Sequence, residues 1–316
     1  MEYILLLVGF ALLLYGGKLL IKGGVGLASR FNISPLVIGL TVVSFGTSAP
    51  ELFVSLIAAV KQHPEVALGN VVGSNIANVA LVLGLTALIF PIPVRSSSVK
   101  IDAPFMLGIT LLLWLFMVSG GAGTISRPEG LIFVILLVAY ISGHIYFSRK
   151  KRVTAEVSDK DKRLTIWQII LLLIIADAAL AIGSELLVNN ASKIALKFGI
   201  SERVIAISIV AFGTSLPELA TSAIAAFKKE MDISIGNIIG SNIFNILAVL
   251  GISSLVKPIS VSEGFLHFDM YWVLGTSLLL FLFILPFKGG KLTRPKSAIL
   301  FLSYCVYIYM LYINPA

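Results

Sequence analysis

The stretch Phe45–Leu52 (FGTSAPEL) decides how this chain folds, because a near copy of it returns 167 positions later as Phe212–Leu219 (FGTSLPEL). A second pair of matching stretches follows without a gap: GNVVGSNI at 69–76 returns as GNIIGSNI at 236–243. Each copy places a proline and a glutamate within apolar sequence. Proline breaks helices, and acidic residues are rare at membrane depth. The chain therefore contains two equivalent elements, each built around a helix break and an acidic side chain.

The composition is that of an integral membrane protein. Hydrophobic residues make up 58% of the chain and charged residues only 13%, against about 25% charged residues in a typical soluble domain. The mean hydropathy is +1.00. A membrane-spanning helix needs about 20 apolar residues, so the chain has room for ten. We expect them at 3–28, 35–61, 67–90, 101–119, 129–148, 165–197, 203–227, 233–256, 266–286 and 296–314.

The repeat divides these helices into two sets of five. Residues 1–148 form the first set, 149–164 a hydrophilic basic linker, and 165–316 the second set. Because five is odd, the second set enters the membrane in the opposite sense to the first. We therefore predict an all-α membrane protein of ten helices, arranged as two inverted five-helix repeats with broken helices 2 and 7 at the centre.

The net charge of +8 follows the topology of the chain. Of the 24 Lys and Arg residues, 16 lie in the loops after odd-numbered helices and six in the loops on the other side. Cytoplasmic loops carry the excess of basic residues. We therefore expect a multi-pass protein of the cell membrane with both termini outside and a cytoplasmic 149–163 loop. The bilayer accounts for the basic charge, and we expect no nucleic-acid partner.

The repeated prolines predict backbone oxygens without helical partners. Pro50 and Pro217 lack an N–H and crowd the carbonyls of Gly46 and Gly213, four residues back. Helices 2 and 7 should therefore be kinked or broken at these points. An unpaired carbonyl is too costly against lipid, so each break must face protein or a wet cavity. A hard cation such as Ca²⁺ or Na⁺ would satisfy such oxygens.

Helical spacing gathers further oxygen-bearing side chains on the same faces. One set lies on helix 2 and repeats on helix 7: Thr47, Ser48, Glu51 and Ser55, and Thr214, Ser215, Glu218 and Ser222. Another lies on helix 3 and repeats on helix 8: Asn70, Ser74 and Asn78, and Asn237, Ser241 and Asn245. No soft ligand belongs to either set, which favours Ca²⁺ or Na⁺ over zinc or copper. The two glutamates supply a charge of −2, which balances one Ca²⁺ or two Na⁺.

The two GTSxPE motifs, each followed by GNxxGSNI, resemble the alpha repeats of the calcium/cation antiporter superfamily, and most of all those of prokaryotic sodium/calcium exchangers. The resemblance covers nearly the whole chain. It implies a Ca²⁺ site made by Glu51, Glu218 and the carbonyls of Thr47 and Thr214. It also implies flanking Na⁺ or shared polar sites formed by Ser48, Ser74, Ser215, Ser241, Asn78, Asn245 and the carbonyl of Ala211. Such proteins are not enzymes, use no cofactor, and move helices 1 and 6 past a central bundle.

Two positions depart from a symmetric or typical pattern. Some relatives carry an aspartate where this chain has Asn245, which leaves potassium co-transport and stoichiometry open. Ser44 stands opposite Ala211 in the repeat, so the two Na⁺-side pockets need not be equivalent.

The sequence thus predicts an antiporter that expels Ca²⁺ from the cytoplasm in exchange for Na⁺, with no obligate protein partner evident. The alternative on the same fold is a Ca²⁺/H⁺ antiporter, and a cation channel is a more distant one. A membrane-embedded hydrolase is disfavoured, because the chain has neither HExxH nor GxSxG.

Two acidic residues of helix 6 have no acidic counterpart in the first repeat. We expect Glu185 to pair with Lys18 or to lie near the water boundary. Asp177 is deeper, and a role in the ion pathway or in a proton relay is a hypothesis. The three histidines, His63, His144 and His267, show no metal-binding spacing and are expected to be incidental.

Overall fold

The computed structural model describes residues 1–31, 33–95, 97–119, 123–150, 164–198, 213–285 and 290–313. Helices account for nearly all of them, with two short antiparallel strand pairs between loops. Eight of the described helices are long and apolar enough to cross a membrane, and a ninth span results when one bent pair is counted together. The expected all-helical architecture is therefore confirmed.

In the first half of the chain the elements follow one another with few loop residues between them. They are α1 (Glu2–Phe31), α2 (Pro35–Ile38), η1 (Gly39–Val43), α3 (Ser44–Thr47), α4 (Ala49–Val60), α5 (Pro64–Ile76), η2 (Ala77–Leu83), α6 (Gly84–Ile89), β1 (Ile92–Val94), η3 (Ser98–Asp102), α7 (Ala103–Ser119), β2 (Thr124–Ile125) and α8 (Arg127–Lys150). The η elements are π-helical segments within longer helices.

The second half repeats this order. Its described elements are α9 (Ile166–Lys197), α12 (Leu216–Phe227), α13 (Met231–Phe244), η6 (Asn245–Leu250), α14 (Gly251–Val256), β3 (Ile259–Ser260), η7 (Phe265–Asp269), α15 (Met270–Ile284), β4 (Gly290–Leu292) and α16 (Arg294–Ile313). These bounds agree with the predicted spans to within a few residues. The first part of the predicted helix at 203–227 lies outside the described residues. So does most of the predicted linker at 149–164, although α8 continues to Lys150.

Helix 2 is broken where the motif predicts. The segments Pro35–Thr47 and Ala49–Val60 meet at an angle of 48°. Ser48 lies between them with φ −89° and ψ 3°, and Ser215, directly before α12, has nearly the same angles of −90° and 5°. Pro50 and Pro217 each lie in the first turn after the break, where the missing N–H costs nothing. The same chemistry therefore starts α4 and α12 in the same way.

The π-helical segments also recur in register. The segment η2 begins one residue before Asn78 and η6 begins at Asn245, its repeat partner; η3 and η7 are likewise 167 residues apart. A π-turn loosens the regular ladder of backbone hydrogen bonds and often occurs at functional sites. Both repeats therefore place a widened helical turn beside an asparagine.

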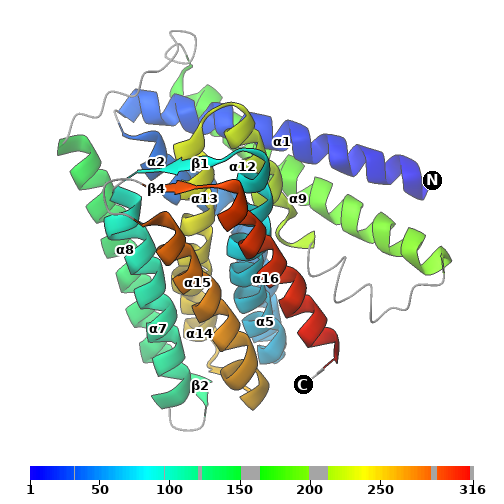
Figure 1. The fold of residues 1–316 in the computed structure, drawn as a ribbon, viewed down its shortest axis with the longest axis vertical. Helices are drawn as coiled ribbons and strands as arrows, with labels where there is room; N and C mark the ends of the chain where they lie inside the picture. The colour runs from blue at the N-terminus through cyan, green and yellow to red at the C-terminus, as the bar shows by residue number, and fades with distance from the viewer. Residues whose placement is uncertain are drawn as a thin grey trace.

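Helices α1 and α9 form a closely packed pair that lies beside the rest of the bundle (Figure 1). Glycines allow this contact: a side-chain carbon on Gly9 would lie 2.8 Å from the Gly183 carbonyl oxygen, and one on Gly16 would lie 3.0 Å from that of Ala176. Small residues at such crossings let two helix backbones approach in a membrane. The backbones of α1 and α9 therefore pack directly against each other.

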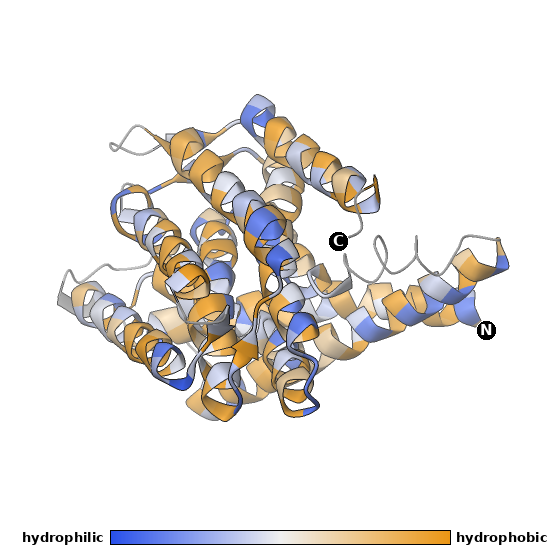
Figure 2. Ribbon diagram, turned by 90° about the horizontal axis from the view of Figure 1, so that it is seen from below, coloured by the Kyte–Doolittle hydropathy of each residue, from blue (hydrophilic) through white to orange (hydrophobic). Residues whose placement is uncertain are grey.

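The continuous helices α5–η2–α6 and α13–η6–α14 form the centre of the bundle, and the buried core follows them. Two strand pairs join the halves at opposite ends, β1 with β4 and β2 with β3. Figure 2 shows hydrophobic residues along every helix, including the outer ones. Polar residues at the centre of this bundle therefore need a specific explanation.

Candidate ion-binding site

The two motif glutamates lie in the first turn of the half-helices α4 and α12. Each is 1% exposed. The N-terminus of a helix carries a partial positive charge, which stabilises a carboxylate in its first turn. Ser48, three residues before Glu51, bonds to the Glu218 carboxylate, so the two acids lie in the same part of the core. Because α4 and α12 both begin directly before these residues, each acid has a favourable backbone environment in the core.

Many oxygens around these acids have no hydrogen-bond donor among the described residues. Neither oxygen of Glu51 has a partner, and Glu218 has a partner at Oε1 only. The hydroxyls of Ser74 and Ser215 are also unpaired. A buried acceptor left without a donor is costly, and a buried charge is far more so. The set needs a positively charged species to complete it.

A few hydroxyls connect the two repeats at this point. Ser48 donates to Oε1 of Glu218 over 3.4 Å. The Thr47 hydroxyl lies 3.1 Å from Oδ1 of Asn237 and 3.2 Å from the hydroxyl of Ser241. These hydroxyls therefore join the break in helix 2 to α13 and to the second glutamate.

Four asparagines near the site are held by protein groups. Asn75 and Asn242 donate to each other's main-chain carbonyl, both over 3.2 Å. Asn70 donates to Ser55 over 2.9 Å, and its repeat partner Asn237 donates to Ser222 over 3.0 Å. These contacts recur at the repeat spacing. They join α5 to α13, and they join α5 to the half-helix α4 and α13 to the half-helix α12.

Asn78 and Asn245 differ from these four. Neither the amide nitrogen nor the oxygen of Asn78 has a partner among the described residues. Asn245 donates to Oδ1 of Asn75 over 3.0 Å but leaves its own oxygen unpaired. Both side chains lie at the π-helical segments. Their amide oxygens are therefore available for an ion in the core.

The remaining predicted ligands are less closely defined. Thr214 is partly buried at the break before α12, and Ala211 lies outside the described residues. Ser44 donates to the Gly39 carbonyl over 2.6 Å and approaches the Asn237 carbonyl at 3.0 Å. Its hydroxyl therefore lies at the contact between α3 and α13.

The chemistry of this set points to a hard cation. Within the described part of the chain, no Lys or Arg forms an ion pair with either glutamate, and no group of three His, Cys, Asp or Glu side chains is placed to hold a metal. Carboxylate, hydroxyl and amide oxygens are the ligands that Ca²⁺ and Na⁺ prefer. Two carboxylates match one divalent or two monovalent ions.

Comparison with known proteins identifies the family. The sodium/calcium exchanger protein family matches residues 1–146 and 168–313. The chain belongs to the sodium/calcium exchanger family. It is 38% identical to the putative antiporter CaxA of Alkalimonas amylolytica and 33% identical to the sodium/calcium exchanger MaX1 of Methanosarcina acetivorans, with 98% of each chain covered in both comparisons.

A solved structure shares the fold. The sodium-calcium exchanger NCX_Mj, soaked with zero Na⁺ and Ca²⁺, superposes with a TM-score of 0.82 at 32% sequence identity over 98% of both chains. The chain is therefore a multi-pass membrane antiporter of this family, and the resemblance inferred from the motifs is confirmed.

One cluster in this exchanger corrects the sequence analysis. His144, expected to be incidental, lies with Nε2 3.0 Å from Oδ1 of the fully buried Asp102. The Tyr140 hydroxyl donates to the same oxygen over 3.2 Å. The repeat holds a matching pair, Tyr307 donating to Asp269 over 2.8 Å. The register of 167 residues could have revealed both Asp–Tyr pairs, whereas the contact with His144 depends on how α7 packs on α8.

The acidic residues of α9 were also predicted individually. Glu185 is exposed and forms no ion pair with Lys18 among the described residues, so the expected pairing with Lys18 is wrong. His63 is exposed at the end of helix 2. Asp177 is partly buried and is treated below.

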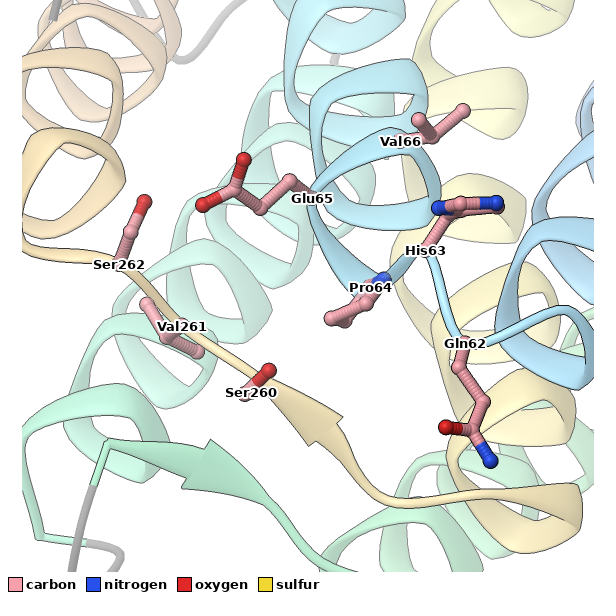
Figure 3. A pocket seen from close by; sticks show the side chains of 8 residues that line it. All are labelled: Gln62, His63, Pro64, Glu65, Val66, Ser260, Val261 and Ser262. Carbon is pink, nitrogen blue, oxygen red and sulfur yellow. The ribbon is translucent and has the colours of Figure 1, made fainter.

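A separate hollow of about 390 Å³ lies away from the buried acids, between the start of α5 and the β3 segment (Figure 3). Glu65 and Ser262 line it. Their repeat partners, Asp232 and Arg95, form an ion pair at the other end of the exchanger. This hollow is open and holds one exposed carboxylate, and the buried oxygens lie elsewhere. It is not the candidate ion site.

Proposed function

We propose that this protein exchanges Na⁺ for Ca²⁺ and thereby expels Ca²⁺ from the cytoplasm. The observation that carries the proposal is the pair of buried glutamates, three of whose four carboxylate oxygens lack a donor among the described residues. An empty site with two ionised acids at membrane depth is costly, by at least about 2.5–3.5 kcal/mol for each charge. The protein should therefore change conformation readily only when cations fill the site, which couples one ion to the other.

In the proposed site, Glu51, Glu218 and the carbonyls of Thr47 and Thr214 hold Ca²⁺. The hydroxyl and amide oxygens around them hold Na⁺; they belong to Ser48, Ser215, Ser74, Ser241, Asn78 and Asn245, with the carbonyl of Ala211. The unpaired oxygens of Glu51, Ser74, Ser215 and Asn78 support this assignment. Na⁺ and Ca²⁺ would share the carboxylates, so that binding of one displaces the other.

The proposed architecture is ten helices in two inverted repeats of five. The reciprocal contacts of Asn75 with Asn242 support it, as do the matching backbone angles of Ser48 and Ser215 and the recurrence of π-helical segments 167 residues apart. With the basic loops inside, both termini face outside and the 149–163 loop faces the cytoplasm. The α1–α9 pair would slide past the central helices and open the site to one side at a time.

The experiment is uptake of radiolabelled Ca²⁺ into proteoliposomes that hold either a Na⁺ gradient or a pH gradient alone. The proposal predicts uptake that requires internal Na⁺. Uptake driven by the pH gradient and indifferent to Na⁺ would assign the coupling to protons. Flux without any counter-ion would indicate a channel, and no Ca²⁺ flux under any gradient would refute the proposal.

A further inference from the structure

A carboxylate outside the repeated motif touches the break in helix 2. Asp177 lies on α9, and its side chain packs directly on Gly46, two residues before the break. A side-chain carbon on Gly46 would overlap the Asp177 carboxylate, lying 3.0 Å from Cγ and 3.1 Å from Oδ2. Gly46 therefore leaves the space that this carboxylate occupies.

The carboxylate lacks the partners that usually accompany a buried acid. Its Oδ1 is buried and accepts no hydrogen bond from the described residues. None of the ion pairs in the described part of the chain includes it. An acidic residue at membrane depth without a basic partner marks an ion pathway more often than a structural contact.

The equivalent glycine in the other repeat meets a different part of α9. Gly213, the partner of Gly46, packs against the apolar side chain of Val188, and its carbonyl accepts a hydrogen bond from Ser184 over 2.6 Å. At that break α9 supplies a donor. At Gly46 it supplies a carboxylate whose Oδ1 has no donor among the described residues. A buried carboxylate oxygen without a donor is costly, and a cation that comes close would complete it.

We propose that Asp177 is a third anionic contact for the transported cations, located where α9 meets the broken part of helix 2. It lies outside the pair of glutamates and travels with the α1–α9 pair. Its charge attracts a cation that approaches or leaves the central site on this side. Because Coulomb energy scales with the charge of the ion, Asp177 favours Ca²⁺ over Na⁺.

The test compares Asp177→Asn, which keeps the shape and removes the charge, with Asp177→Glu, which restores it. The Asn variant should need about tenfold more Ca²⁺ and about threefold more Na⁺ for half-maximal transport, because the logarithmic shift for a divalent ion is twice that for a monovalent ion. Asp177→Glu should recover most of both affinities. Glu185→Gln is the matched control, since it removes an exposed carboxylate from the same helix.

Unchanged affinities in Asp177→Asn would overturn the proposal. So would equal shifts for Ca²⁺ and Na⁺, or the same shifts in Glu185→Gln, because these indicate a general effect of surface charge. Asp177→Ser provides a second removal of the charge, with thermal melting in detergent as a check of folding. The proposal rests on the proposed function. Titration of purified protein with Ca²⁺ reads the effect without transport, so that failure of exchange and failure of the Asp177 contact are distinguished.

Discussion

The half-helices α4 and α12 begin with the same motif but are covered to different extents. In α4 only four residues are buried, whereas eight are buried in α12. The clearest pair is Ile57, which is 53% exposed, and its repeat partner Ile224, which is 8% exposed. The same residue type at the same repeat position therefore has two environments.

The α1–α9 pair accounts for this difference. Gly17 of α1 lies over α12, where a side-chain carbon on it would be 2.6 Å from Cδ1 of Ile224. No comparable cover of Ile57 exists in the described part of the chain. In the proposed orientation, α12 points to the cytoplasm and α4 to the outside. A protein that opens one side at a time needs such an asymmetry, and equal repeats can exchange their roles.

The largest effect is expected at the two buried glutamates, and it tests whether Glu51 of α4 and Glu218 of α12 are equally important although the two half-helices differ in exposure. Glu51→Gln and Glu218→Gln should each reduce Ca²⁺ uptake to the level of empty vesicles, because either change removes one of the two carboxylates of the central site. Proteoliposome uptake measures both. Glu65→Gln, which removes an exposed carboxylate, should transport normally. Substantial transport by one glutamate variant alone would show that the acids do not share an ion.

A second pair of variants measures how much the packing of α1 on α12 stabilises the protein. Ile224→Ala should destabilise the protein by about 2–5 kcal/mol because it leaves a cavity under α1. Ile57→Ala should cost less than about 0.5 kcal/mol, as exposed positions usually do. Thermal unfolding in detergent compares them. Equal losses would mean that α4 and α12 are covered alike in solution.

The packing of α1 on α9 can be tested next. Gly9→Ala would place a methyl group 2.9 Å from the Leu187 nitrogen, and such overpacking costs about 1–3 kcal/mol. Gly143→Ala in α8 is the control, because its methyl group would meet nothing within 4 Å. It should leave unfolding unchanged or raise the melting temperature. A harmless Gly9→Ala would argue against a close pair.

The smallest effect concerns the contacts that join the repeats. Asn75→Ala should cost about 1–2 kcal/mol, and Asn242→Ala less, because Asn75 also accepts a hydrogen bond from Asn245. Each variant removes a separate bond, because each side chain donates to a main-chain carbonyl that the other variant keeps. Thermal unfolding in detergent compares them, and losses below about 0.5 kcal/mol in both variants would show that the reciprocal bonds do not hold α5 to α13.

Much of this arrangement could be predicted from the repeated motif. Pro50 placed the break in helix 2, and the spacing of the polar residues placed Glu51, Ser74 and Asn78 on inward faces. These features are local: they follow from the chemistry of proline and from helical periodicity. The exposure of Ile57 against Ile224 could not be predicted, because it depends on where the α1–α9 pair rests.

Contacts between helices from different parts of the chain could not be predicted from the sequence either. The first repeat has Phe10 at the position equivalent to Asp177, so the repeat gives no acidic counterpart. The contact of Asp177 with Gly46 depends on the rotation of α9 about its axis. The pairing of His144 with Asp102 likewise requires α8 to lie on the start of α7. A single sequence predicts which face of a helix is buried, but it does not predict which other helix that face contacts.

The central claim is that Glu51 and Glu218 together form one cation site that Ca²⁺ and Na⁺ share. Equilibrium titration of the purified protein with Ca²⁺ tests it most directly. We predict one Ca²⁺ for each chain, displaced by Na⁺ and lost in both Glu51→Gln and Glu218→Gln. Binding that survives in either variant, or that Na⁺ does not displace, would contradict the account.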